Sequence, residues 1–134
     1  MSTLTRTSPL LRWVLLADAA TCAAMGLLLL LGAGWLAQFF ALPPDLSRFA
    51  GASLLPFAAL LVYSAARATL APAAIWAVIL LNVLWVIGSI LLLVAGGIEP
   101  NGLGVAFVLG QAGGVALFAV LEYFGLRQSL AQAR

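Results

Sequence analysis

The stretch that decides the fold is residues 74–96, AIWAVILLNVLWVIGSILLLVAG, which contains no charged side chain. A helix rises about 1.5 Å per residue, so a segment of this length can cross the ~30 Å hydrocarbon core of a bilayer. Asn82 and Ser89 are the main polar interruptions. We therefore predict a transmembrane helix here.

Three more apolar stretches, residues 11–34, 46–67 and 103–126, predict further membrane-spanning helices. The composition agrees, because 65% of the chain is hydrophobic and 7% is charged, whereas soluble proteins are about half apolar and a quarter charged. The four stretches leave no room for a separate soluble domain. The sequence predicts an all-α, polytopic membrane protein: a four-transmembrane-helix bundle forming a single transmembrane domain over residues 1–134.

The two halves of the chain are candidates for a repeat of helical hairpins. Residues 13–34 and 76–97 both begin with Trp, carry consecutive leucines late and end in Gly. Such a parallel repeat would have its axis along the membrane normal.

Arginine positions predict the orientation in the membrane, since all six basic residues are Arg. With four spans, one side holds Arg48 together with Asp45 and Glu99. Both termini and the connection at residues 68–73 lie on the other side, with Arg6, Arg12, Arg67, Arg127 and Arg134. Cytoplasmic segments carry the excess of positive charge, so we expect an inner (plasma) membrane protein with cytoplasmic N- and C-termini.

Several chemistries are excluded by residue counts. The chain has one cysteine, Cys22, and no histidine. A Ser-His-Asp triad, histidine-ligated haem and imidazole-ligated zinc cannot form within one chain. We predict no enzyme activity, no cofactor and no metal. The arginines sit at helix ends, where they suit lipid headgroups better than nucleic acid, so the expected partner is membrane lipid.

Polar side chains inside the predicted helices are the candidate functional residues, because intramembrane acids usually face protein or water. Helix geometry puts Asp18 and Asn82 at similar depths, and Glu122 lies on the cytoplasmic side as well. The candidates for ligand binding or proton coupling are Asp18, Asn82, Trp85, Glu122, Arg67 and Gln111.

A structural alternative stands beside each candidate. Amide and hydroxyl side chains commonly join membrane helices by hydrogen bonds, and Glu122 could pair with Arg67 or Arg127 near the headgroups. The spacing Gly110-x-x-x-Gly114 predicts a surface where another helix packs closely.

Two resemblances accompany these residues. The motif Leu10-Leu11-Arg12 and the four closely spaced helices loosely resemble small bacterial DoxX-like membrane proteins, although the Gly-x-x-Lys expected late in the first helix of that group is missing. The chain also resembles the small multidrug resistance transporters, which have four helices and one essential acid in the first. That likeness implies a proton and cation site at Asp18, in a sequence whose acid is Asp rather than Glu.

Two functions remain open at this stage. The first is a non-enzymatic integral membrane protein, either an accessory subunit of a larger membrane complex or a binder of a lipid or other apolar ligand. The alternative is a small proton-coupled transporter that acts as a homo-oligomer with an intramembrane Asp.

Overall fold

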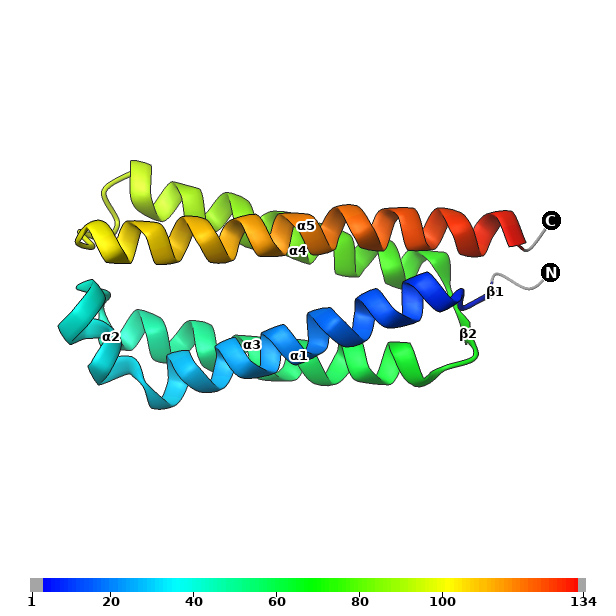
Figure 1. Cartoon of the computed structure of the whole chain (residues 1–134), viewed down its shortest axis with the longest axis horizontal. Coiled ribbons are helices and arrows are strands. Elements are labelled where there is room, and N and C mark those ends of the chain that lie inside the picture. The colour runs from blue at the N-terminus through cyan, green and yellow to red at the C-terminus, as the bar shows by residue number, and fades with distance from the viewer. Residues whose placement is uncertain (1–3, 133–134) are drawn as a thin grey trace.

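The computed structural model describes residues 4–132, which are helical apart from two short strands (Figure 1). Prolines at the first helical positions of α1, α3 and α4 suit helix starts, because proline lacks the N–H that would go unpaired there. The elements are β1 (Thr5–Arg6), α1 (Pro9–Leu31), α2 (Ala33–Phe40), α3 (Pro44–Ala66), β2 (Thr69–Leu70), α4 (Pro72–Val94) and α5 (Gly102–Gln132).

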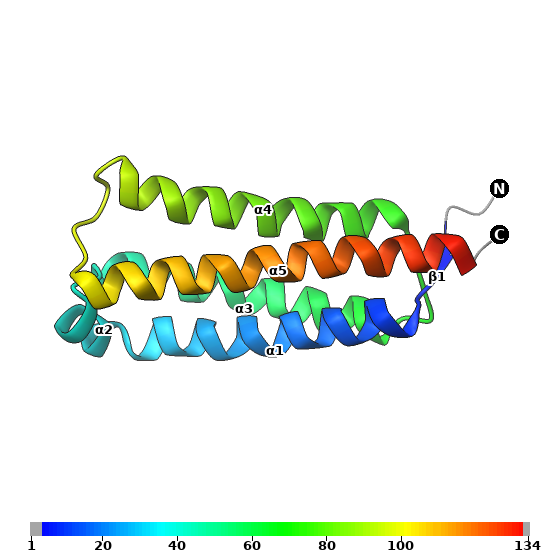
Figure 2. The ribbon, with the colours of Figure 1, turned by 45° about the horizontal axis from the view of Figure 1, so that its top comes forward.

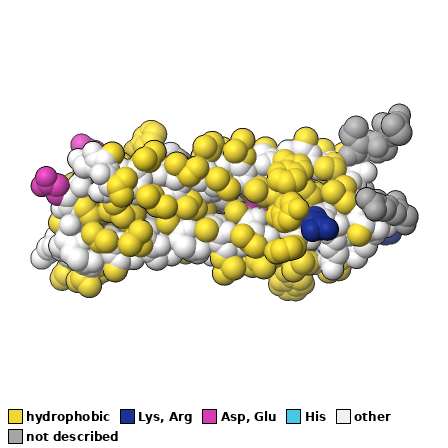
Figure 3. All heavy atoms as spheres, turned by 90° about the horizontal axis from the view of Figure 1, so that it is seen from above, with side chains coloured by type: hydrophobic (Ala, Val, Ile, Leu, Met, Phe, Trp, Pro, Cys, Tyr) yellow, Lys and Arg dark blue, Asp and Glu magenta, His cyan; other side chains and the backbone are white. Residues whose placement is uncertain are grey.

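Four helices, α1, α3, α4 and α5, are long and apolar enough to cross a membrane. Large hydrophobic side chains point outward along all four, including Trp13, Phe49 and Leu84. Figure 3 shows hydrophobic side chains over much of one face, with charged side chains gathered mainly towards the ends. A surface of this kind is stable against lipid rather than water. The prediction of an all-α, multi-pass membrane bundle is confirmed.

The long helices form two antiparallel hairpins. α1 packs along α3, α4 packs along α5, and the two pairs meet chiefly through α1 and α5 (Figure 1). α3 and α4 are consecutive in the chain, yet within the described residues they make few or no close backbone contacts. The bundle therefore has a seam between α3 and α4. That the two hairpins are repeats of one sequence unit remains a prediction.

The first predicted helix was too long and the last too short. Residues 11–34 were expected to be continuous, but α1 ends at Leu31 and the separate helix α2 follows Gly32, whose N–H bonds to the carbonyl of Leu28. α2 lies across the end of the bundle away from the termini (Figure 2). It ends where Ala41 adopts a left-handed conformation with φ 54°.

α5 extends to Gln132 rather than stopping near residue 126, because its last turns are held by the start of the chain. The backbone N–H of Ser8 donates to Ser129 Oγ at 2.9 Å, and Ser8 Oγ donates to the carbonyl of Gly125. Ser8 Oγ also accepts from Leu11 N as the N-cap of α1. This end of the bundle is further closed by the antiparallel pairing of β1 with β2.

Close helix contacts occur at glycines other than those predicted. A Cβ added at Gly51 would lie 2.6 Å from the carbonyl oxygen of Gly26, so α1 and α3 touch backbone to backbone there. At Gly110 and Gly114 an added Cβ would meet nothing within 4 Å. No other helix of the described chain packs closely at these two glycines, so whether a helix of another copy packs there stays a prediction. The spacing rule identifies surfaces that permit close approach but does not say which of them is used.

The charged residues divide as the four-span topology requires. Arg12 lies in the first turn of α1 and Arg67 follows α3, at the same end as both described termini, while Asp45 and Arg48 lie at the start of α3 at the other end. Arg134 is outside the described residues.

Candidate functional site

The centre of the bundle holds two acids joined by one amide. Asn82 Nδ2 on α4 donates to Asp18 Oδ2 on α1 at 3.0 Å and to Glu122 Oε1 on α5 at 2.6 Å. The three side chains are 3%, 1% and 0% exposed respectively. Asn82 therefore ties the α1–α3 hairpin to the α4–α5 hairpin through side chains from three helices.

Within residues 4–132, no positive charge forms an ion pair with these acids. The one ion pair in residues 4–132 joins Arg48 to Asp45 at the far end of the bundle. The Arg12 guanidinium donates to the carbonyls of Ala65 and Arg67, and these bonds keep it at the surface. Since a charge at the centre of a membrane helix costs about 2.5–3.5 kcal/mol on insertion scales, two neighbouring uncompensated carboxylates would be a severe penalty.

The hydrogen bonds at the two acids are unequal. Asp18 accepts at both oxygens, because Cys22 Sγ donates to Oδ1 at 3.3 Å while Asn82 donates to Oδ2. Glu122 accepts only at Oε1, and its Oε2 is the one buried side-chain nitrogen or oxygen in the described chain without a hydrogen-bond partner. Buried polar atoms are paired in the great majority of cases, so this atom needs an explanation.

A second polar group lies further from the termini on α4 and α5. Trp85 Nε1 donates to Gln111 Oε1 at 2.7 Å, Gln111 Nε2 donates to Ser89 Oγ at 3.0 Å, and Ser89 Oγ donates to the carbonyl of Trp85. Gln111 Nε2 also donates to the carbonyl of Val108. These groups satisfy one another and hold the Trp85 indole in place.

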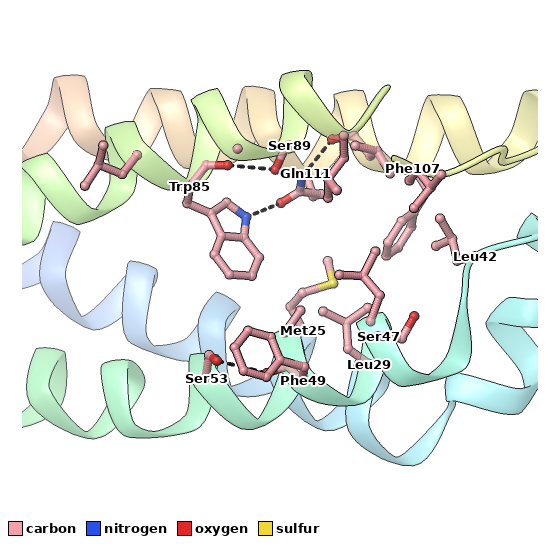
Figure 4. Close-up of a pocket in the computed structure, with 17 residues that line it drawn as sticks. Met25, Leu29, Leu42, Ser47, Phe49, Ser53, Trp85, Ser89, Phe107 and Gln111 are labelled. Carbon is pink, nitrogen blue, oxygen red and sulfur yellow. Dashed lines mark hydrogen bonds between the residues drawn. The ribbon is translucent and has the colours of Figure 1, made fainter. Parts of the chain in front are cut away.

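A cavity of about 390 Å³ opens along the seam between α3 and α4. Figure 4 shows Trp85 and Gln111 on one wall facing Met25, Phe49 and Ser53 on the other. Most of the wall is apolar, and the remaining members include Leu29, Leu42, Leu46, Leu84, Leu92, Ile98, Phe107 and Val108. Ligand sites in proteins are typically about 300–1,000 Å³ and mainly apolar, so the cavity has the size and lining of a binding site.

A second cavity of about 390 Å³ lies next to the acids. Asn82 and Cys22 form part of its wall, and Trp85 and Ser53 line both cavities. The two cavities are therefore neighbours, and the wall of the second includes two hydrogen-bond partners of Asp18.

The structure brings some predicted site residues together and separates others. Asp18, Asn82 and Glu122 meet, as their predicted depths suggested. Arg67 lies apart and donates to Tyr63 Oη at 2.7 Å. Arg127 stacks over the Tyr123 ring instead of pairing with Glu122.

The residues of the cavity walls were not predicted from the sequence. Phe49 and Phe107 come from helices whose relative placement decides whether they face lipid or a cavity, and no periodicity reports that placement. The signal that was readable is the spacing of four residues between Asp18 and Cys22, which puts both side chains on one face of a helix.

In comparisons with known proteins, no family model, curated protein or solved structure matches this chain. The likeness to DoxX-like proteins and to small multidrug resistance transporters therefore stays a prediction.

Proposed function

We propose that this protein is a non-enzymatic membrane component that binds the hydrocarbon part of a lipid or similar apolar molecule in the seam between α3 and α4. The observation that carries the proposal is the cavity of about 390 Å³ along this seam, between two consecutive helices that make few or no close backbone contacts. Exposed Phe49 and Leu84 form part of its wall, so a molecule can enter sideways from the bilayer.

The chemistry of the wall favours an apolar occupant. Trp85, Gln111 and Ser89 bond to one another, and Ser53 Oγ donates to the carbonyl of Phe49. These polar groups are already paired, so the first cavity offers mainly apolar contact. Burying hydrocarbon against such a wall is worth about 25 cal/mol per Å² when the alternative is water. Because lipid tails are themselves apolar, shape must select the occupant here.

The test is to fill the first cavity without disturbing the fold. Gly88 lines this cavity, and a Cβ added there would meet nothing within 4 Å. We expect Gly88→Leu to remain folded, because leucine favours helix over glycine by up to about 1 kcal/mol. Native mass spectrometry of protein released gently from its own membrane should show a bound lipid-like molecule on the wild type and several-fold less on Gly88→Leu.

The matched control is Gly113→Leu, because Gly113 also has open space around it but lines neither cavity. It should retain the bound molecule like the wild type. Equal retention by Gly88→Leu, or a wild-type protein that carries no such molecule, would contradict the binding proposal. A second protein found in the same complex would favour an accessory subunit.

A proton-coupled transporter is the second candidate, and the pair of uncompensated acids on Asn82 favours it. A homo-oligomer would then line a path with Asp18 near the cytoplasmic side. Asp18→Asn should abolish proton-driven uptake into vesicles while leaving folding and assembly unchanged. Unchanged uptake in that variant would remove this candidate.

We place the protein in the inner (plasma) membrane with both termini in the cytoplasm, on the strength of the arginine distribution. The proposed partners are membrane lipid and either further copies of the same chain, in a homo-oligomer, or other proteins, in a larger membrane complex. Neither function requires a nucleic acid, a metal or a cofactor.

A further inference from the structure

The hydrogen bonds around Asp18 are those of a carboxylate. Its two oxygens accept from two different donors, the Asn82 amide on α4 and the Cys22 thiol on α1. An ionised carboxyl group can only accept, and each of its oxygens has lone pairs for the purpose. The arrangement at Asp18 needs no proton on the acid.

The hydrogen bonds around Glu122 are those of a carboxylic acid. Oε1 accepts from Asn82, as the carbonyl oxygen of an acid does, while Oε2 is buried with no donor directed at it. An ionised oxygen in that position would lose its hydration without replacement. A proton on Oε2 turns the same atom into a hydrogen-bond donor. The Asp18 carboxylate accepts from the same amide nitrogen as Glu122 and is therefore a nearby acceptor.

The surrounding charges favour a single negative charge on the two acids. The titratable groups at the cluster are Asp18 and Cys22 on α1 and Glu122 on α5, while α4 contributes the neutral Asn82. No described arginine forms an ion pair with either acid. When two carboxyl groups share a site without a cation, the charge on one disfavours ionisation of the other.

We propose that Glu122, Asn82 and Asp18 form a proton-binding site at the centre of the bundle, in which Glu122 holds the proton and Asp18 holds the negative charge. Asn82 links the two acids by donating a hydrogen bond to each of them. Since Asn82 and Cys22 also line the second cavity, a molecule there would contact two of the groups that stabilise the Asp18 charge. The site is defined without reference to any bound molecule, so its test is independent of the lipid-binding proposal.

Infrared spectroscopy of the purified protein at neutral pH tests the assignment directly. The chain contains only four acidic side chains, and Asp45 and Glu99 are exposed at one end. We expect the C=O stretching band of a protonated carboxyl group in the wild type and in the control Asp45→Asn/Glu99→Gln. Glu122→Gln should lose the band, whereas Asp18→Asn should keep it. Loss in Asp18→Asn with retention in Glu122→Gln would overturn the assignment.

A proton count on the unmodified protein makes the test independent of how well the variants fold. Transfer from a mild to a denaturing detergent in weakly buffered solution at neutral pH exposes both acids. The wild type should release one proton per chain, and Glu122→Gln should release none. Release of no proton by the wild type would mean that both acids are ionised, and release of two that neither is. Either result would overturn the proposal.

Discussion

At the scale of single residues, Asn82 has the largest structural role of the polar side chains. Its one amide nitrogen bonds two buried acids that belong to different helices. Among the described residues, neither acid has another side-chain nitrogen donor. The remaining bond to Asp18 comes from the Cys22 thiol, which is a weak donor. Removing the amide therefore leaves two buried acceptors poorly paired.

We predict that Asn82→Ala destabilises the protein by about 2–4 kcal/mol, since each buried polar group left unsatisfied costs about 1–3 kcal/mol. The measurement is unfolding by a denaturing detergent, followed by circular dichroism. Gln111→Ala is the matched control, because it also removes an intramembrane amide, but one bonded to Trp85 and Ser89. Its expected loss is about 1 kcal/mol or less, as for typical interhelical bonds in membranes. Equal losses would show that the acids do not depend on Asn82.

Residue-level features of the site were partly predictable. The depth of Asp18, Asn82 and Glu122 follows from counting residues along a helix, and a shared depth predicted their meeting. The partners were not predictable. Glu122 could as well have reached an arginine near the headgroups, and only the packing of α5 against α1 and α4 turns it inward.

At the scale of helices, the glycines decide which pairs approach closely. Gly51 on α3 lies against the backbone of α1 at Gly26 and Leu30, whereas Gly110 on α5 faces open space. The same residue type therefore has opposite consequences for substitution, and the Gly-x-x-x-Gly spacing marks Gly110 rather than Gly51.

Gly51→Ala and Gly110→Ala should change stability in opposite directions. The added Cβ at position 51 would come within 2.7 Å of Leu30 N, and such overpacking usually costs about 1–3 kcal/mol. At position 110 the methyl group meets nothing, so the higher helix propensity of alanine should stabilise by up to about 1 kcal/mol. Detergent unfolding of the two variants measures both. Destabilisation by Gly110→Ala would instead indicate that a second copy of the chain packs there.

The errors in helix bounds also have physical causes. Residues 27–37 contain no polar or charged side chain apart from the indole of Trp35, so hydrophobicity could not reveal the break at Gly32 that separates α1 from α2. The polar residues after 126 resemble a frayed tail, but Ser129 bonds to Ser8, 121 positions away in the chain. Contacts over such a separation are invisible to local patterns.

At the scale of the whole molecule, the order of packing explains the seam. α1 lies between α3 and α5, and α5 lies between α1 and α4, so the two outer helices are left facing each other across the cavities. Composition predicted four spans, and the described residues form four helices that are long and apolar enough to cross a membrane. It could not predict which two helices would fail to pack, because all four expose apolar side chains.

The arginine distribution leads to a prediction about the whole chain. Positive residues accumulate on cytoplasmic segments, and the described termini share their end of the bundle with Arg12 and Arg67 (Figure 1). The native cysteine is first replaced in a Cys22→Ser variant, because serine keeps a hydrogen-bond donor for Asp18. A single cysteine is then placed at exposed Glu99 or at exposed Ala131, and its labelling reports on which side of the membrane that end lies. A membrane-impermeant thiol reagent should label Glu99→Cys on intact spheroplasts and Ala131→Cys only after lysis.

The opposite labelling pattern would invert the assigned orientation and put Asp18 near the outer face. Equal labelling of both cysteines on intact spheroplasts would mean that the chain inserts both ways, as an antiparallel homodimer requires. A single orientation restricts any symmetric assembly to parallel copies, whose axis runs along the membrane normal. In such an assembly the proton site that we propose at Glu122 would lie at the same depth in every copy.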